Sequence, residues 1–164
     1  MITSRTKPAK KLDALLVKTP VGELTVFALG DAIVALDWGQ GGDATRTTKS
    51  PVLNRAAQAL SAYFKTGILD TKALRLAPQG TPFQQRAWSA LQKIKSGHTK
   101  TYGEIAEALH SAPRAVGGAC AANPIPILIP CHRVISADGK LSFYSGGDGP
   151  KTKAFLLRLE GALT

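Results

Sequence analysis

The most constraining stretch of this chain is NPIPILIPCHRVIS, residues 123–136, an apolar run interrupted by proline. Proline lacks a backbone N–H and fixes its own φ angle, so Pro126 and Pro130 stiffen the chain around them. We therefore predict a buried, extended segment that holds Cys131 in a fixed position, which would distinguish it from a cysteine that merely packs in the core.

The residues that follow this cysteine can activate it. A buried cysteine most often packs as a small hydrophobic residue, but His132 and Arg133 come directly after Cys131. A free thiol titrates near ~8.5, so a nucleophilic cysteine needs a base or a positive field to ionise at neutral pH. Neighbouring side chains of an extended chain point in opposite directions, so we expect His132 to reach the sulfur through a water. A carboxylate such as Glu160 would orient the imidazole, which completes a cysteine–histidine–acid relay.

Zinc binding is the alternative use of these side chains. The chain has two cysteines, Cys120 and Cys131, without C-x-x-C spacing, and its histidines at positions 98, 110 and 132 are scattered. Zinc sites draw their cysteine and histidine ligands from closely spaced pairs. We therefore predict no metal.

The bulk sequence predicts a cytoplasmic protein. No apolar run approaches the roughly 20 residues that span a bilayer, which predicts no membrane partner. The basic N-terminus MITSRTKPAKK, residues 1–11, is not followed by the apolar region of a secretory signal. Two cysteines without such a signal fit a reducing compartment, where a disulfide is not expected.

Residues 1–80 are predicted to form a small domain of sheet and helix. Residues 14–39 are rich in strand-forming side chains and are broken at 20–22 and 30–31, which predicts hairpins. Residues 39–50 read as a loop. Ser50 and Pro51 then begin a helix that Gly67 ends. Its apolar stripe is Leu53, Ala57, Leu60 and Phe64. Residues 68–80 predict a weaker strand and a linker.

Residues 81–164 are predicted to form a mostly helical second domain, which makes the fold α/β in the α+β sense. Thr81 with Gln84, and Thr101 with Glu104, are capping boxes that each begin a helix. A break at 111–113 precedes another short helix, and this pair predicts a helix-turn-helix. Two helices that simply pack in an α domain are the alternative.

The second helix of this pair has almost no side-chain bulk. Its small residues are Ala115, Gly117, Gly118, Ala119, Ala121 and Ala122. Each glycine inside a helix costs about 1 kcal/mol, so a close approach of the backbone to another molecule would explain them. The formal net charge of +10 and pI of about 9.9 fit a nucleic-acid-binding protein, although a solvated basic surface is the alternative.

Three segments together resemble the O6-alkylguanine-DNA alkyltransferases, also called methylated-DNA–protein-cysteine methyltransferases. They are PRAVGGACAANP (113–124), NPIPILIPCHRVI (123–135) and YSGG (144–147). The resemblance is dense over 81–147 and looser up to Gly161. Over residues 1–80 it rests on strand pattern and length alone.

The resemblance implies a protein that accepts an alkyl group once and is consumed. Cys131 would be the nucleophile, and His132, a water and Glu160 would generate the thiolate. The substrate would be double-stranded DNA carrying O6-alkylguanine, with O4-alkylthymine as a further candidate. It implies no cofactor, and we expect a monomer.

The resemblance also implies that the target nucleotide is flipped out, because a thiol cannot reach O6 inside a stacked duplex. The small-residue helix, with Ala115 and Gly117, would enter the minor groove. Arg114 would take the vacated place in the stack. Tyr102 would crowd the phosphate and donate a proton to guanine N3.

The substrate pocket that the resemblance implies is made of Asn123, Pro126, Val134, Tyr144, Ser145, Gly146 and Lys153. Two departures from the family pattern bear on this pocket. The stretch before Lys153 is slightly longer than the pattern, which makes that match looser. Ser142 and Phe143 precede Tyr144 where a glycine commonly comes first, so Ser142 either narrows the pocket or points to solvent.

Three rival functions remain at this stage. A non-catalytic lesion-binding relative would lack the reactive cysteine, which Cys131 argues against. A helix-turn-helix transcription factor would need side chains that read bases in the major groove, and the small-residue helix offers few. A cysteine hydrolase would turn over repeatedly.

Overall fold

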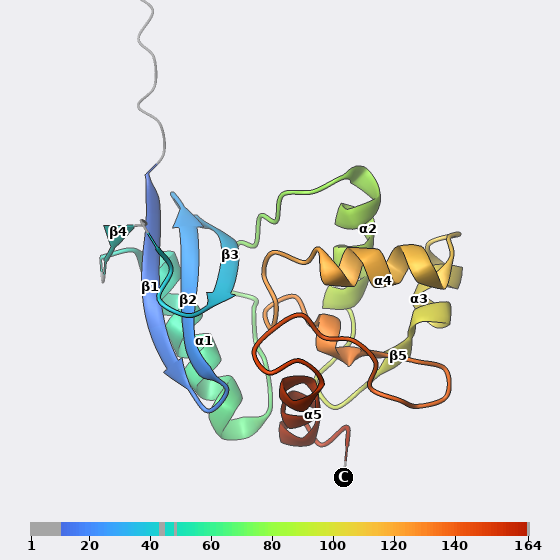
Figure 1. Cartoon of the computed structure of the whole chain (residues 1–164). Helices are drawn as coiled ribbons and strands as arrows, with labels where there is room; N and C mark the ends of the chain where they lie inside the picture. The colour runs from blue at the N-terminus through green and yellow to red at the C-terminus, as the bar shows by residue number, and fades with distance from the viewer. Residues whose placement is uncertain (1–10, 43–44, 48, 164) are drawn as a thin grey trace, which may run out of the picture.

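The computed structural model describes residues 11–42, 45–47 and 49–163. The basic tail noted at residues 1–10 lies outside these ranges. Figure 1 shows a sheet with one helix on the N-terminal side and a cluster of short helices on the C-terminal side.

The N-terminal sheet confirms the predicted hairpins. Its strands are β1 (Leu12–Thr19), β2 (Gly22–Leu29), β3 (Ala32–Trp38) and β4 (Thr45–Arg46). The strand order is β3-β2-β1-β4, with β1, β2 and β3 antiparallel and β4 parallel to β1. The short β4 corrects the prediction of a plain loop over 39–50, because its backbone bonds to the free edge of β1.

Helix α1 (Pro51–Thr66) begins and ends where predicted. The Ser50 side chain accepts a hydrogen bond from the backbone of Leu53, and Gly67 ends the helix in the left-handed conformation with φ of 76°. The buried face is rotated from the predicted stripe, because the helix is covered on two sides by the sheet and the C-terminal half. The fully buried residues are Val52, Leu53, Ala56, Leu60 and Tyr63.

The weak strand predicted within residues 68–80 does not form as a strand. Only Leu76 makes a bridge, to Ile33 of β3, through bonds from Ile33 N to Arg75 O and from Ala77 N to Ile33 O, both 2.8 Å. Pro78 follows and has no N–H to continue the ladder. The segment therefore touches the edge of β3 once and then continues as the linker.

The C-terminal half consists of short helices and one small parallel strand pair. Its elements are α2 (Pro82–Gln92), β5 (Lys100–Thr101), α3 (Tyr102–Ala108), α4 (Pro113–Ala121), η1 (Cys131–Arg133), β6 (Val134–Ile135) and α5 (Pro150–Leu159). Both predicted capping boxes are present, at Thr81 with Gln84 and at Thr101 with Glu104. Helices α3 and α4 pack together as the predicted helix-turn-helix pair.

The proline-rich run is buried, as predicted, but it is not extended. Ile125, Ile127 and Ile129 are fully buried. Ile127 has a φ of 71°, and Ile129 N bonds back to Ile125 O at 2.9 Å, so the run folds through tight turns. It then enters the 3₁₀ turn η1, in which Cys131 N donates to Ile129 O at 2.8 Å. The turns bury the isoleucines while pairing their backbone groups, which an isolated extended segment could not do.

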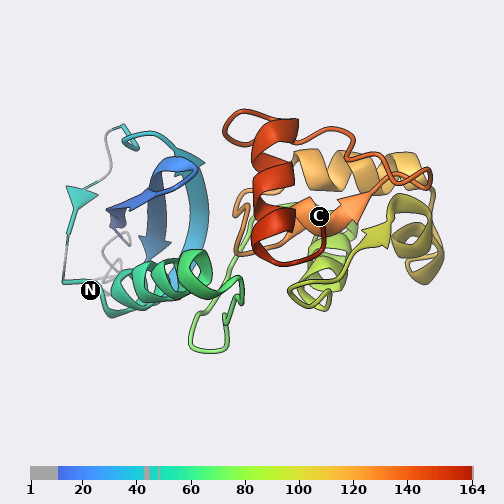
Figure 2. The same cartoon turned by 90° about the horizontal axis from the view of Figure 1, so that it is seen from below.

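The two halves of the chain pack through β3. In Figures 1 and 2, β3 is the strand nearest the C-terminal helices. Leu36 N of β3 donates to Pro124 O at 2.9 Å, and buried residues of both halves form one continuous core. Gly67 also lies so close to Leu159 O at the end of α5 that a Cβ would not fit. No helix among the described residues is long and apolar enough to cross a membrane.

Candidate active site

A cavity of about 440 Å³ opens between α3, α4, η1 and the segment just before α5. Cys131 lies in its wall and is 5% exposed. The residues that line the cavity are Tyr102, Pro113, Arg114, Gly117, Cys120, Ala121, Cys131, Ser142, Phe143, Tyr144 and Ser145. Seven residues singled out from the sequence (Tyr102, Arg114, Gly117, Cys131, Ser142, Tyr144 and Ser145) therefore come together around one cavity.

Beside the cysteine, His132 and Glu160 form a buried pair. His132 Nε2 lies 2.8 Å from Glu160 Oε1, and both side chains have no solvent exposure. The other ring nitrogen, Nδ1, has no hydrogen-bonding partner among the described residues. Since the carboxylate can only accept, Nε2 carries the proton and Nδ1 has a free lone pair.

Arg133 and Tyr63 complete the network around this carboxylate. Arg133 donates to Glu160 through Nε at 3.0 Å to Oε2 and through a terminal nitrogen at 2.7 Å to Oε1. Its guanidinium also donates to Ile94 O at 2.6 Å. From α1 in the N-terminal half, the Tyr63 hydroxyl donates to Glu160 Oε1 at 2.8 Å. Three side chains, those of His132, Arg133 and Tyr63, are thus held by the buried Glu160 carboxylate.

The environment sets the resting charges of this network. Burial alone would raise the pKa of Glu160, but hydrogen bonds from His132 and Arg133 outweigh it and lower that pKa to about 2. Burial lowers the pKa of His132, although Glu160 opposes the shift. Burial raises the pKa of Cys131. At neutral pH the site therefore rests as a thiol, a neutral imidazole and a carboxylate.

Two further groups favour the thiolate once it forms. A hydrogen bond from the Asn123 side chain and the nearby charge of Lys153 both act to lower the pKa of Cys131. Asn123 is itself fixed, because its Nδ2 donates to Ile129 O at 2.8 Å and its Oδ1 accepts from Ile125 N at 3.0 Å. Asn123 therefore ties the end of α4 to the turns that lead to Cys131.

Tyr102, Ser142 and Lys153 meet at another side of the cavity. The Tyr102 hydroxyl lies 3.0 Å from Ser142 Oγ. The buried ammonium of Lys153 donates to Val134 O at 2.6 Å and lies 3.5 Å from Ser142 Oγ. Burial lowers the pKa of Lys153, and the two thiols oppose that shift. Ser142 therefore faces the cavity and not the solvent, and it does so with a φ of 58°, in the left-handed region.

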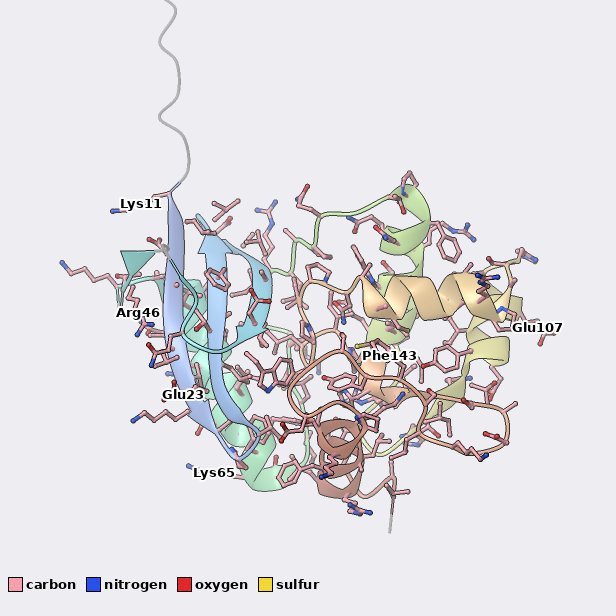
Figure 3. The ribbon with its side chains drawn as sticks, viewed as in Figure 1. Lys11, Glu23, Arg46, Lys65, Glu107 and Phe143 are labelled. Atoms are coloured by element: carbon pink, nitrogen blue, oxygen red, sulfur yellow. The ribbon has the colours of Figure 1, made fainter. Side chains whose placement is uncertain are left out.

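The outer rim of the cavity is open to a large ligand. Arg114 is exposed at the start of α4, and a Cβ at Gly117 or Gly118 would meet nothing within 4 Å. Phe143, labelled below α4 in Figure 3, is 66% exposed although it is a large hydrophobic residue. Ala115 is exposed on α4 and does not line the cavity.

Five residues expected in the pocket do not line the cavity: Asn123, Pro126, Val134, Gly146 and Lys153. Pro126 and Gly146 line a separate cavity on the side of β3, together with Trp38. Val134 is buried and contributes its carbonyl to Lys153. These residues can shape the pocket only through the residues that do line it.

The sequence interpretation missed several members of the site. Arg133 was noted beside His132 but was given no role. A charged guanidinium next to a buried relay needs an anionic partner, and this requirement could have indicated its contact with Glu160. Tyr63 and Trp38 come from the N-terminal half, and nothing in their local sequence indicates which distant residue they contact. Cys120 was set aside with zinc, yet it lines the same cavity as Cys131, where burial raises its pKa to about 12.

The fold and cavity define a helix-turn-helix protein with a buried cysteine–histidine–glutamate site, and comparison with known proteins identifies the family. Residues 14–78 match the ribonuclease-like domain of 6-O-methylguanine DNA methyltransferase, and residues 82–162 match its DNA-binding domain. The chain belongs to this family.

Individual relatives cover nearly the whole chain. The constitutive methylated-DNA–protein-cysteine methyltransferase of Bacillus subtilis is 40% identical over 153 residues, which cover 87% of this chain and 92% of that protein. The methylated-DNA–protein-cysteine methyltransferase of Mycobacterium tuberculosis H37Rv is 42% identical over 150 residues, which cover 88% of this chain and 89% of that protein. The crystal structure of M. tuberculosis OGT in complex with DNA superposes with a TM-score of 0.80 at 39% identity, covering 92% of this chain and 93% of that one.

Proposed function

We propose that this protein repairs DNA directly by moving the alkyl group of O6-alkylguanine onto Sγ of Cys131 in a single turnover. The observation that carries the proposal is the placement of Cys131 in a cavity wall, next to His132 whose Nδ1 is free and whose Nε2 is fixed on Glu160. Membership of the methyltransferase family supports the same activity.

The relay begins with the thiol of Cys131 protonated. We expect the proton to pass to Nδ1 of His132, through a water as the sequence analysis predicted, because no direct bond joins the two side chains among the described residues. Glu160 stabilises the imidazolium that forms, and its depressed pKa keeps it ionised. Asn123 and Lys153 stabilise the thiolate.

The thiolate then attacks the alkyl carbon. An S–C bond forms as the C–O6 bond breaks, and the electron pair of that bond stays on the guanine. Tyr102 lines the cavity and is a candidate proton donor to guanine N3. The thioether has no good leaving group, so the protein is consumed.

DNA binding is assigned to α4 and its rim. A helix whose exposed face carries glycine and alanine fits the minor groove, which is only about 6 Å wide. Arg114 stands exposed at the start of this helix and beside the cavity, where it can replace the flipped base in the stack. Ala115 and Gly117 would lie against the groove.

The remaining assignments follow from the same reading. We propose two domains, residues 1–80 and 81–164, and the family matches that end at 78 and start at 82 support this division. We also propose a cytoplasmic monomer acting on double-stranded DNA, with O4-alkylthymine as a second substrate. The described residues contain no group of three or more His, Cys, Asp or Glu side chains that could hold a metal ion.

Intact-mass spectrometry tests the proposed function. After incubation with an oligonucleotide duplex containing O6-methylguanine, the protein should gain the mass of one methyl group, and peptide mapping should place it on Cys131. Cys131→Ser should gain no mass yet bind the duplex with nearly wild-type affinity, because phosphate contacts supply most of that affinity. Repeated turnover would favour a hydrolase, and an unmodified wild-type protein would favour a lesion-binding or transcription-factor role.

A further inference from the structure

Trp38 ends β3 and is fixed from within the N-terminal half. Its indole Nε1 donates to Val21 O at 3.0 Å, across the sheet. The indole ring reaches the segment just before α5, where Trp38 lines a cavity with Gly146 and Gly147. In Figure 2, β3 is the strand nearest the C-terminal helices.

The indole lies directly on the backbone of Gly146 and Gly147. A Cβ added to Gly146 would lie 2.5 Å from indole Cη2, and one added to Gly147 would lie 3.0 Å from Nε1. Only glycine leaves room for this contact. The ring of Tyr144 completes it, edge to face with Trp38 at a centroid distance of 6.2 Å and an interplanar angle of 88°.

The segment that Trp38 supports is the wall of the active-site cavity. Tyr144 and Ser145 line the active-site cavity, and Ser145 also lines the neighbouring cavity beside Trp38. Among the described residues, the backbone of 142–145 makes no hydrogen bond to other backbone groups, and the buried Tyr144 hydroxyl has no partner. Packing, and not a hydrogen-bond ladder, therefore fixes the position of this wall.

We propose that Trp38 is a positioning residue for the alkylguanine pocket, which holds the Tyr144–Gly147 wall in place from the N-terminal half. This inference rests on the proposed function and deepens it. It gives the N-terminal half a specific task in base binding, in addition to its contact with Glu160 through Tyr63.

The proposal separates base binding from sulfur chemistry. Among the described residues, Trp38 donates its hydrogen bond to Val21 O and does not line the cavity of Cys131, so its removal leaves the hydrogen bonds of the relay in place. Trp38→Ala removes the surface on which Gly146 and Gly147 rest, and the wall can then relax away from the base. Misplacement by about 1 Å can cost on the order of a hundredfold in rate, so a partial relaxation is expected to lower the ratio of limiting rate to half-saturating concentration roughly tenfold, through weaker binding of the base.

The test follows the reaction of the whole protein with free O6-methylguanine and O6-benzylguanine over a range of base concentrations. For Trp38→Ala, the half-saturating concentration should rise roughly tenfold, while the limiting rate stays within about threefold. Labelling of Cys131 by iodoacetamide, followed by peptide mass, should proceed at the wild-type rate because it needs no base pocket. Duplex affinity should also be unchanged.

Two variants serve as controls. Trp38→Phe keeps a ring against the glycines and should recover most of the affinity for the base. Phe155→Ala removes another aromatic side chain, one that faces the hairpin around Val21 in a separate cavity and does not line the pocket. It should leave both kinetic constants near wild type. Melting temperatures of all variants report any general loss of the fold.

The outcomes decide between the proposals. An unchanged half-saturating concentration in Trp38→Ala, or an equal loss of iodoacetamide labelling, would overturn the role of Trp38. If Trp38→Ala does not fold, Gly146→Ala forces the same contact apart from the other side and should produce the same rise. Methylation of wild-type Cys131 by duplex DNA tests the proposed function separately, so failure of one is distinguishable from failure of the other.

Discussion

The cysteine end of the cavity and its opposite wall are held by different forces. Around Cys131–Arg133, the buried Glu160 carboxylate binds the adjacent His132 and Arg133 and also Tyr63 from α1. The wall over 142–147 has no such network and rests on Trp38, on the Ser142 hydroxyl and on the Lys153 ammonium, which lies 3.5 Å from Phe143 O. The relay residues, whose atoms must be aligned for proton transfer, are fixed by directional hydrogen bonds. The 142–147 wall, which must fit a base, is fixed mainly by packing, so its position can change more easily.

The largest expected effect comes from removing the charge at the centre of the network. Glu160→Gln leaves the buried Arg133 guanidinium without its anion and His132 without the group that stabilises the imidazolium. General-base catalysis typically contributes about 10²–10⁴-fold, so the methyl-transfer rate should fall by at least a hundredfold. Single-turnover kinetics on a methylated duplex measure the rate.

The matched control for this change is Tyr63→Phe, which removes one of the donors to the same carboxylate but leaves its charge. It should lower the rate severalfold at most, since His132 and Arg133 still hold Glu160. Equal losses in the two variants would show that geometry, and not charge, is what Glu160 supplies.

The network also predicts a stability loss in acid. Glu160 has a pKa of about 2 in the folded protein against an ordinary value of 4.5, so its stabilisation is complete above pH 4.5 and is lost as the pH falls toward 2. His132, whose pKa is lowered by burial, adds a loss that begins below its ordinary 6.5. Each unit of pKa difference is worth about 1.4 kcal/mol.

Urea unfolding between pH 7 and pH 3 measures this loss. Wild type should lose stability steadily across the range, and Glu160→Gln, although less stable at pH 7, should lose less between pH 4.5 and pH 3. Parallel curves for the two proteins would assign the acid sensitivity to other groups.

The rim of the cavity should matter only when the base starts inside a duplex. Arg114→Ala should slow repair of O6-methylguanine in double-stranded DNA by tens of times, because unstacking a base costs a few kcal/mol. Its reaction with the free base should be nearly unchanged, since Arg114 is exposed at the rim of the cavity and makes no hydrogen bond to the buried His132–Glu160 pair among the described residues. Comparing the two rates in one preparation checks this, and equal losses would place Arg114 in a structural role.

The local signals in the sequence were sufficient for elements that depend on neighbours in the chain. The caps at Ser50, Thr81 and Thr101, and the hairpin breaks near 20–22, act within a few residues and were predicted correctly. The Cys131–His132–Glu160 constellation was found because its residues carry recognisable chemistry. Contacts such as Tyr63 with Glu160 join residues far apart in the chain, and no local pattern indicates them.

Two wrong predictions share one physical cause. The strand predicted within 68–80 and the extended run over 123–130 both contain strand-forming residues next to proline. In each case the edge of β3 makes a single contact, a bridge to Leu76 or a bond from Leu36 N to Pro124 O, and the proline-rich run otherwise pairs with itself through tight turns. The β-propensity of these residues predicted extended strands, but each segment makes only one backbone contact with β3.

The smallest expected effect, and the sharpest test of the packed wall, lies at Ser142. This residue has a φ of 58°, which L-residues rarely adopt and glycine adopts freely, and its side chain occupies the cavity between Tyr102 and Lys153. A benzyl group needs space where a methyl group does not. Ser142→Gly should therefore speed inactivation by O6-benzylguanine severalfold, while the rate of methyl repair stays within about twofold, since the sulfur and its relay are unchanged.

The control variant Ser142→Ala keeps the Cβ and removes only the hydroxyl, so it separates the effect of space from that of hydrogen bonding. If its benzyl rate equals that of Ser142→Gly, the Oγ contacts with Tyr102 and Lys153 hold the wall. If wild type and Ser142→Gly react with benzylguanine at the same rate, the wall moves freely enough to admit the ring, and packing does not set the size of the pocket.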